Sequence, residues 1–406
     1  MSSAQPRRPT AVLVPGLIAF SMGQTVLFAL AGPVFREIGM SESQLGIIIS
    51  AAGVVFVASS TVWGRIADRW GRKPSIVFGL TCYGLISLAF AGVMQMGLDS
   101  VLSVTTVFFI LLLLRLMYAA LGGGIQPASV ALMADLSSEE ERSSAVAIVG
   151  AAFGIGMVLG PASVPLFVGF GVLTPLYVIA VLGLLTAALA AWKLPHSKAP
   201  PTSSDQPSAT IAWSTLGVLL GGALLLFCTM SILQQTIAFN LQDLLGTDSA
   251  ETARLTGFCF MAIAIATLIV QGGVIQVLKP PASLLLLVGP PLILVGMFVY
   301  VGATSYVFVL LASVLFGIGF GFTTPGLQTA ASLLAGADEQ GKVAGVMQAT
   351  MSAGFVIGPI SGTAVYEVDR IYAAQLALGS ASLALVLVFL WLLMHRDRLR
   401  QVNASA

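Results

Sequence analysis

Long apolar runs dominate the hydrophobic pattern of this chain. Twelve runs are separated by short stretches that contain charged residues or clusters of Pro, Gly and Ser. A helix of about 20 mostly apolar residues crosses the hydrocarbon of a bilayer. Because the strands of a membrane barrel would instead alternate apolar and polar positions over about ten residues, the pattern predicts an all-α membrane protein with twelve transmembrane helices. The runs cover residues 11–34, 45–64, 75–96, 104–132, 143–169, 172–192, 214–239, 254–277, 282–302, 305–334, 343–366 and 371–394.

One long polar stretch divides these runs into two groups of six. Residues 193–213 are rich in Pro and Ser, which is typical of a flexible linker. We therefore expect an N-terminal six-helix bundle at residues 1–192, a cytoplasmic linker at 193–213 and a C-terminal six-helix bundle at 214–406.

The two halves resemble each other in sequence. When the chain is shifted by 198 residues against itself, Gly123 meets Gly321 and Pro127 meets Pro325, and the same frame holds through the next run. This match predicts an internal duplication. In transporters built from two such parallel repeats, substrate binds near the bilayer midplane between halves that rock against each other.

Composition and charge exclude several classes of protein. Of the 406 residues, 57% are hydrophobic and 9% are charged, whereas soluble domains carry about 25% charged residues. A soluble cytosolic enzyme is therefore excluded. The formal net charge of +1 provides no basic surface for nucleic acid, so we expect no nucleic-acid partner.

The Lys and Arg residues lie mostly on one side of the predicted bundle. Fourteen of the eighteen fall in the tails and loops of the side that holds both termini. Cytoplasmic loops of membrane proteins carry such an excess of Lys and Arg. We therefore expect both termini in the cytoplasm and a multi-pass location in an inner (cytoplasmic) membrane.

The loop between the second and third runs carries a distinctive motif. It holds four cations, one Asp and two Gly within eleven residues. An ordinary cytoplasmic loop needs cations but neither an Asp nor spaced glycines. The motif resembles the G-x-x-x-D-R-x-G-R-[KR] signature of the major facilitator superfamily, and its fixed positions here are Gly64, Asp68, Arg69, Gly71, Arg72 and Lys73.

This resemblance implies a conformational latch. In that family the motif Asp, here Asp68, interacts with the start of the eleventh helix and with neighbouring cations. A helix N-terminus carries about half a positive charge, so such a contact is physically favourable. The resemblance implies that the latch must break before the cytoplasmic side opens.

A second motif combines glycines spaced four apart with a proline. It is present in the fifth run and again in the eleventh, and it resembles the antiporter signature of the drug-proton antiporter branch of that family. Small residues at this spacing let helices approach closely, although ordinary glycine packing in membranes would produce a similar pattern. In the fifth run Val164 and Pro165 replace a trailing glycine pair. The matched positions are Gly156, Gly160 and Pro161, and Gly354, Gly358 and Pro359.

Arg115 lies well inside the fourth run. An ionisable residue at membrane depth is by default a candidate functional residue. Positions 115, 118, 122 and 126 share one helical face, so Arg115, Tyr118 and Gln126 are expected to line a substrate cavity. Alternatively, Arg115 joins helices by binding backbone carbonyls. Further candidate substrate-binding residues, which combine amides with aromatic rings, are Gln24, Phe28, Gln234, Gln235 and Gln328.

No carboxylate falls in the middle of any predicted span. All seventeen Asp and Glu residues map to loops or helix ends. Either a helix-end acid such as Asp135 or Glu367 carries protons, or the substrate itself has ionisable groups that interact with Arg115. The chain has no phosphate-binding G-x-x-x-x-G-K-[ST] loop, and no His or Cys spacing typical of a metal or haem site. We therefore expect no ATP hydrolysis and no cofactor.

These observations predict a monomeric secondary transporter. We expect it to export a small organic molecule, either a drug-like compound or a metabolite such as a siderophore, in exchange for protons by alternating access. The alternative is an uptake facilitator or proton symporter of the same fold for a small anionic or zwitterionic metabolite. A sensor of this fold that does not transport also remains open. An intramembrane enzyme is excluded, because the spans hold no His or acid to pair with a nucleophile and we expect no catalytic residues.

Overall fold

A computed structural model describes residues 7–138, 142–195, 213–334 and 339–395. Every regular element in these ranges is helical, and twelve helical segments are long and apolar enough to cross a membrane, so the predicted all-α architecture is confirmed. The first six segments are α1 (Arg7–Ile38), α2 (Glu42–Trp70), α3 (Arg72–Leu98), α4 (Val104–Gly122) with α5 (Ile125–Asp135), α6 (Arg142–Phe167) with the short η1 (Val168–Phe170), and α7 (Thr174–Lys193).

The second six segments follow the same order. They are α8 (Trp213–Leu245), α9 (Ser249–Leu268) with η2 (Ile269–Val274) and α10 (Ile275–Leu278), α11 (Ala282–Val301), α12 (Tyr306–Leu334), α13 (Gln340–Val368) and α14 (Arg370–Met394). Most helices extend a few residues beyond the apolar runs, because polar residues form their ends.

The ends of α2 show how polar residues set these bounds. At its start Ser41 and Gln44 form a reciprocal capping box, in which each side chain accepts a hydrogen bond from the other's backbone N–H. At its end Gly71 has φ +99°, a conformation that glycine adopts without steric strain. The turn between α2 and α3 therefore needs glycine at this motif position.

Two of the spans are interrupted. Gly123 and Gly124 separate α4 from α5, and a Cβ at Gly124 would lie 2.8 Å from the Trp63 ring. In the eighth span η2 is a π-helix, a widened turn that recurs at functional sites. The apolar pattern predicted each of these spans as one continuous helix.

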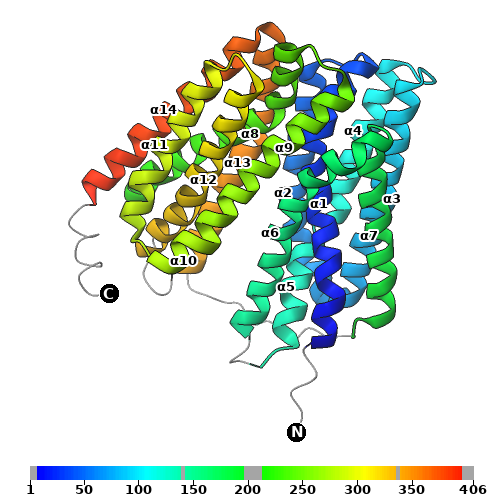
Figure 1. Cartoon of the computed structure of the whole chain (residues 1–406). Helices are drawn as coiled ribbons and strands as arrows, with labels where there is room; N and C mark the ends of the chain where they lie inside the picture. Colours follow the sequence, from blue (N-terminus) through cyan, green and yellow to red (C-terminus); the bar gives the residue numbers. More distant parts are fainter. Residues whose placement is uncertain (1–6, 139–141, 196–212, 335–338, 396–406) are drawn as a thin grey trace. The chain divides into compact units, whose positions relative to one another are not determined.

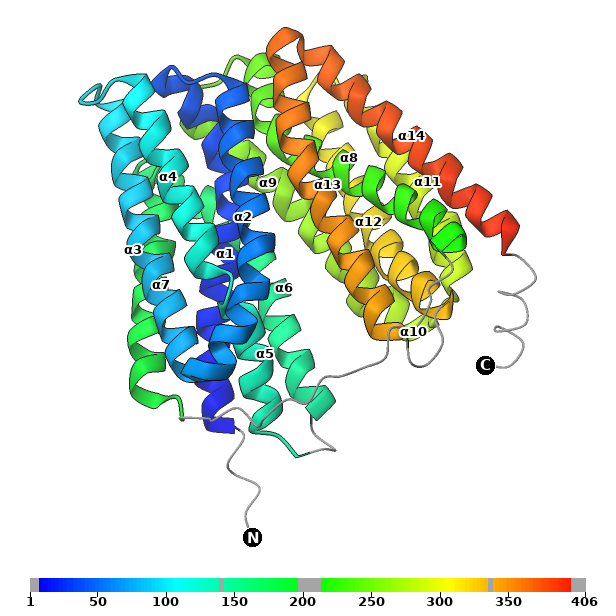
Figure 2. The same ribbon diagram turned by 180° about the vertical axis from the view of Figure 1, so that it is seen from behind.

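The chain divides into two compact units. The first unit contains residues 1–204 and 248–257, and the second contains residues 205–247 and 258–406. The bundle boundaries predicted from the sequence stay a prediction. Within the first unit α1 packs against α6 and α7, and α3 packs against α4 and α7 (Figures 1 and 2).

The packing extends the internal repeat to the first helix of each half. Gly156 of α6 lies against Ile18 of α1, and Gly354 of α13 lies against Leu224 of α8 in the same way. Ile18 and Leu224 are 206 residues apart, whereas the two glycines are 198 apart. A comparison in one fixed frame therefore cannot find this part of the repeat.

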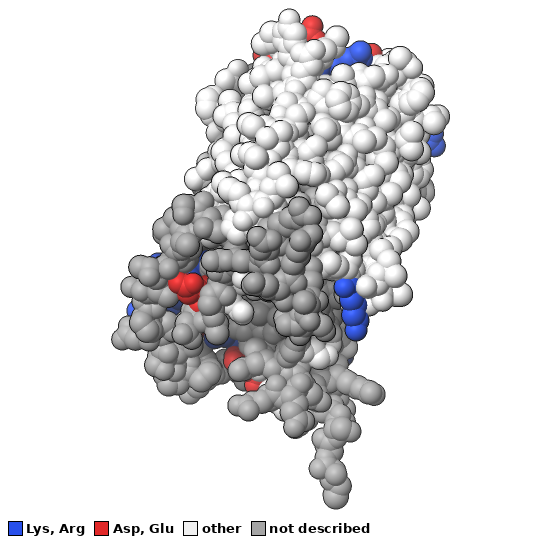
Figure 3. All heavy atoms as spheres, turned by 90° about the vertical axis from the view of Figure 1, so that its left-hand side faces the viewer, with Lys and Arg blue, Asp and Glu red and all other residues white. Residues whose placement is uncertain are grey.

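The outer surface matches the lipid exposure expected of membrane helices. Figure 3 shows a broad face without charged side chains over its middle, with Lys, Arg, Asp and Glu towards its margins. Large apolar side chains are exposed along α11 and α14, among them Leu287, Phe298, Leu383 and Leu390. Such a surface is stable in hydrocarbon and would aggregate in water.

Candidate functional site

A small, partly open cavity lies in the first unit, lined by α1, α3, α4 and α7. The cavity volume is about 20 Å³, so it holds a few water molecules at most. A drug-sized ligand needs a pocket of roughly 300–1,000 Å³. The lining consists of Gly23, Val26, Leu27, Tyr83, Ile86, Ser87, Phe90, Leu114, Arg115, Tyr118, Leu176 and Ile179.

Arg115 faces aromatic rings in this cavity. Its guanidinium carbon lies 4.6 Å from the centroid of the Tyr118 ring, and the Tyr118 and Tyr83 rings meet edge to face at 5.7 Å. Cations are attracted to such ring faces. Among the described residues, neither Arg115 Nε nor the Tyr118 hydroxyl has a hydrogen-bond partner, although both atoms are buried.

Tyr83 joins two helices of the cavity wall, α3 and α1. Its hydroxyl donates a hydrogen bond of 2.8 Å to the carbonyl of Ala19 on α1, and its ring packs against Phe20 at 5.4 Å. This contact fixes α3 against α1 at the depth of Arg115.

We expect Tyr83→Phe to destabilise the protein modestly. The substitution keeps the ring and removes the O–H that donates to Ala19, and such a hydrogen bond contributes about 1 kcal/mol. The thermal unfolding midpoint of the purified protein measures the effect. Tyr372→Phe is the matched control, because Tyr372 is 53% exposed. Equal midpoints for the two variants would show that the Tyr83 hydrogen bond does not stabilise the fold.

The cavity brings together only two of the residues predicted to bind substrate, Arg115 and Tyr118. Gln126 does not line it; this residue lies on α5, beyond the glycine interruption, and is exposed. Tyr83, Ser87 and Gly23 were not singled out by the sequence. A phenol within the apolar third run was the one available signal, because a buried Tyr hydroxyl needs a hydrogen-bond partner.

The remaining predicted substrate residues lie elsewhere in their helices. Gln24 and Phe28 are half-buried on α1, and Gln328 is exposed on α12. Gln234 and Gln235 are buried on α8, and Gln234 Oε1 has no hydrogen-bond partner among the described residues. Their contact with substrate stays a prediction.

Arg72 is the centre of the motif between α2 and α3. Its guanidinium forms an ion pair with Asp68, and its Nε lies 3.5 Å from a carboxylate oxygen of Asp135 at the end of α5. The Arg72 residue is 8% exposed. Arg72 therefore joins three helix ends of the first unit. Asp135, which the sequence offered as a proton carrier, is an ion-pair partner of the motif.

The other motif residues have simpler surroundings. Arg69 is exposed and Lys73 is half-buried, while a Cβ at Gly64 would meet no atom within 4 Å. The predicted contact of Asp68 with the eleventh helix stays a prediction.

The glycine-proline motifs sit where helices touch closely. A Cβ at Gly160 would lie 2.6 Å from the Met22 carbonyl oxygen, and one at Gly358 would lie 2.9 Å from the Cys228 carbonyl oxygen. Ser21 on α1 donates a hydrogen bond of 2.7 Å to the carbonyl of Phe153 on α6. Both α1 with α6 and α8 with α13 thus pack backbone to backbone, as the spacing of small residues predicted.

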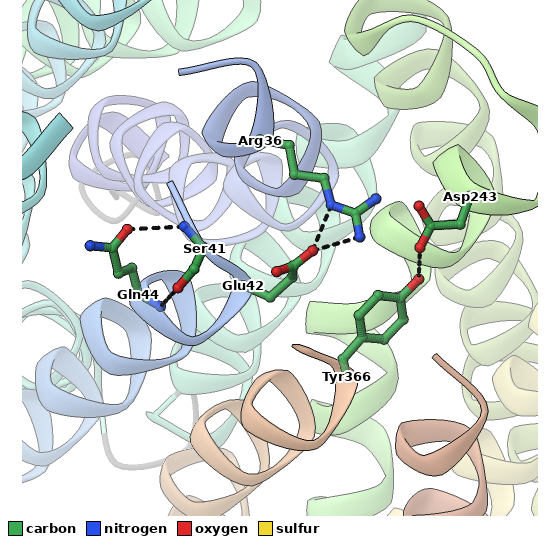
Figure 4. Close-up of polar contacts among 6 residues, drawn as sticks. All are labelled: Arg36, Ser41, Glu42, Gln44, Asp243 and Tyr366. Carbon is green, nitrogen blue, oxygen red and sulfur yellow. Dashed lines mark hydrogen bonds and ion pairs between the residues drawn. The ribbon is translucent and has the colours of Figure 1, made fainter. Parts of the chain in front are cut away.

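Polar contacts also stabilise helix ends within each unit (Figure 4). In the first unit Arg36 at the end of α1 binds Glu42 at the start of α2, with a shortest N–O distance of 2.6 Å. In the second unit the Tyr366 hydroxyl of α13 donates to a carboxylate oxygen of Asp243 of α8 at 2.6 Å. The Asp243 carboxylate therefore accepts a hydrogen bond from Tyr366.

Comparison with known proteins identifies the family. The family model of the Major Facilitator Superfamily matches residues 13–359, which is most of the chain. The chain belongs to the Major Facilitator Superfamily. The resemblance inferred from the α2–α3 motif is thereby confirmed. This member of the superfamily is accordingly a multi-pass membrane transporter, and the family and fold are not those of enzymes.

Two of its relatives have names that indicate drug resistance. The facilitator is 25% identical to "Multidrug resistance protein 2" of Bacillus subtilis (strain 168), over 94% of each chain. It is also 25% identical to "Quinolone resistance protein NorA" of Staphylococcus aureus, over 91% of this chain and 93% of that protein.

Solved structures confirm the fold. A bacterial homologue of the human lysosomal transporter Spinster, in an inward-facing and occupied conformation, matches 98% of each chain with a TM-score of 0.73 at 14% identity. A bacterial homologue of the iron transporter ferroportin matches 96% of this facilitator and 99% of that chain, with a TM-score of 0.70 at 17% identity.

Proposed function

We propose that this facilitator exports a drug-like organic compound in exchange for protons. The observation that carries the proposal is the backbone contact of α1 with α6 and of α8 with α13 at glycine-proline motifs, which resemble the antiporter signature. The resistance names of two relatives that match over most of their length support the same function.

The proposed substrate contacts lie outside the small inner cavity. That cavity has room for a few waters only. Arg115 and Tyr118, which line it, therefore do not contact the compound directly. We assign direct contact to the amides and aromatic ring on α1, α5, α8 and α12, which are Gln24, Phe28, Gln126, Gln234, Gln235 and Gln328.

Proton coupling has to use a group near a helix end or on the substrate. Each acidic residue in the described part of the chain lies near an end of its helix or in a loop. Asp135 forms an ion pair with Arg72. Of the two helix-end acids that the sequence offers, Asp135 and Glu367, we assign the proton to Glu367, which is exposed near the end of α13.

We propose that the transporter works by alternating access, in which its two compact units rock against each other. The ion pairs of Arg72 with Asp68 and Asp135 act as a latch at the α2–α3 turn. We place that turn and both termini on the cytoplasmic side of an inner membrane, because most Lys and Arg residues gather there. The transporter works as a monomer.

Reconstituted transport tests this proposal. In inside-out vesicles with an acidified lumen, we expect accumulation of ethidium or norfloxacin, accompanied by a rise of the lumenal pH. Vesicles without protein are the control. Glu367→Gln should abolish the response to the proton gradient while leaving downhill exchange intact.

The competing functions give different results in the same assay. A facilitator would equilibrate the compound without any response to the proton gradient, and a proton symporter for an anion such as fluorescein would move it out of the lumen. A sensor would bind the compound without moving it. Any of these three results would contradict drug-proton antiport.

A further inference from the structure

The cavity around Arg115 is lined by hydrogen-bond donors that lack acceptors. Arg115 Nε and the Tyr118 hydroxyl are buried without a partner among the described residues. Ser87 lines the same space. Tyr83 contributes no free donor, because its hydroxyl is committed to Ala19. Donor-bearing residues of α3 and α4 therefore line one small volume.

The cavity also holds an uncompensated positive charge. Arg115 forms no ion pair with any described residue of its unit; its guanidinium lies over the Tyr118 ring, and Tyr83 lines the same cavity. The Tyr118 ring attracts the cation through its face. A ring face offers much less than a full counter-charge. Arg115 as a whole is half-buried, but an unpaired charge within a membrane span is costly.

We propose that this cavity binds a small monovalent anion, with chloride as its ordinary occupant. Water could accept the free hydrogen bonds but would leave the charge of Arg115 uncompensated. A cation would be repelled. An organic carboxylate of drug size would not fit a space for a few waters. A halide ion accepts several donors at once and supplies the missing charge.

The rest of the lining favours a weakly hydrated anion. Beside the donors, the wall is formed by apolar side chains such as Val26, Leu27 and Phe90. Such a wall does not replace lost hydration well, so fluoride and sulfate, which hold water tightly, bind less well than chloride or bromide. Tyr118, 5% exposed, lines the site from the same helix as Arg115.

The bound anion stabilises the first unit independently of transport. Its donors come from α3 and α4, and α1 and α7 line the rest of the cavity, so the ion links the helices whose packing surrounds Arg115. A ligand that binds only the folded state raises its stability with concentration. This inference goes beyond the proposed export and does not depend on it.

Thermal unfolding of the purified full-length protein tests the site. Chloride replaces gluconate at constant ionic strength, and no transported compound is present. We expect a saturable rise of several degrees in the unfolding midpoint, a similar rise with bromide and a smaller one with fluoride. In crystals soaked in bromide, an anomalous peak should lie between Arg115 and Tyr118.

Variants separate the cavity from surface effects. Arg115→Met should lose the chloride response and should be at least as stable in gluconate as the wild type, because the uncompensated charge is gone. Tyr118→Phe should weaken apparent chloride affinity several-fold. Arg254→Gln is the control, because Arg254 is exposed and pairs with Glu251; it should keep the full response.

The proposal fails if the wild type unfolds at the same temperature in chloride and gluconate. It fails equally if Arg115→Met retains the wild-type chloride response, since the ion would then act at the surface. If Arg115→Met does not fold, an unchanged chloride affinity in Tyr118→Phe together with no bromide peak in the cavity overturns it.

Discussion

Replacement of Gly160 by valine will abolish transport. A Cβ at this position would lie 2.6 Å from the Met22 carbonyl oxygen and would also meet the Thr25 hydroxyl. Since two backbones occupy this space, α6 has to move away from α1. Overpacking of this kind costs about 1–3 kcal/mol, and a displacement of about 1 Å reduces activity by roughly 100-fold when it reaches positioned groups.

The matched control for this change lies on the same helix. Gly154 is two residues before Gly156, hence on the other side of α6, and a Cβ there meets nothing within 4 Å. Gly154→Val should therefore unfold at nearly the wild-type temperature and retain ethidium transport. In the second unit Gly358→Val and Gly345→Val should show the same contrast. Equal losses within either pair would show that the close helix contact is not the cause.

Replacement of Arg72 by alanine will produce the second large effect. Arg72 is mostly buried and is the ion-pair partner of both Asp68 and Asp135. Removing one partner of a buried ion pair leaves an uncompensated charge and costs about 3–5 kcal/mol. We expect a fall at the lower end of this range, because the Asp68 side chain is 41% exposed and water can solvate it. Chemical unfolding of the purified protein measures the fall.

A double-mutant cycle tests whether the ion pair of Arg72 with Asp135 accounts for the lost stability. Asp135→Asn in the Arg72→Ala background should restore part of the lost stability, because the remaining charge is removed. Arg69→Ala is the control; Arg69 is exposed in the same turn and should change stability by no more than about 0.5 kcal/mol. Strict additivity of the Arg72 and Asp135 effects would contradict a direct interaction between them.

The twelve spans could be predicted from the sequence because each apolar run is long enough to cross the bilayer by itself. The helix ends could not be placed to the residue. Ser41 and Asp369 begin helices by hydrogen bonding to backbone N–H groups, and such polar residues lie outside any hydrophobic window. The break at Gly123–Gly124 was also missed, since glycines are common within membrane helices.

The site was predictable only where one helix determines it. Arg115 is recognisable as a charge in an apolar run, and Tyr118 lies one turn further on the same face. Ser87 comes from α3, and its position in the cavity depends on packing between helices that no local pattern encodes. The pairing of Arg72 with Asp135 depends on tertiary structure in the same way, since 63 residues separate them.

The π-helix distinguishes the eighth span from the second span, although the two make the same kind of contact with a neighbouring helix. In the first unit Ser59 of α2 donates to the Ala119 carbonyl, and in the second Thr267 of α9 donates to the equivalent carbonyl of Gly317. Beyond Thr267 comes η2 (Ile269–Val274), while α2 continues without interruption. A π-helix is a widened turn that recurs at functional sites. The eighth span therefore departs locally from regular α-helix at a level where the second span does not.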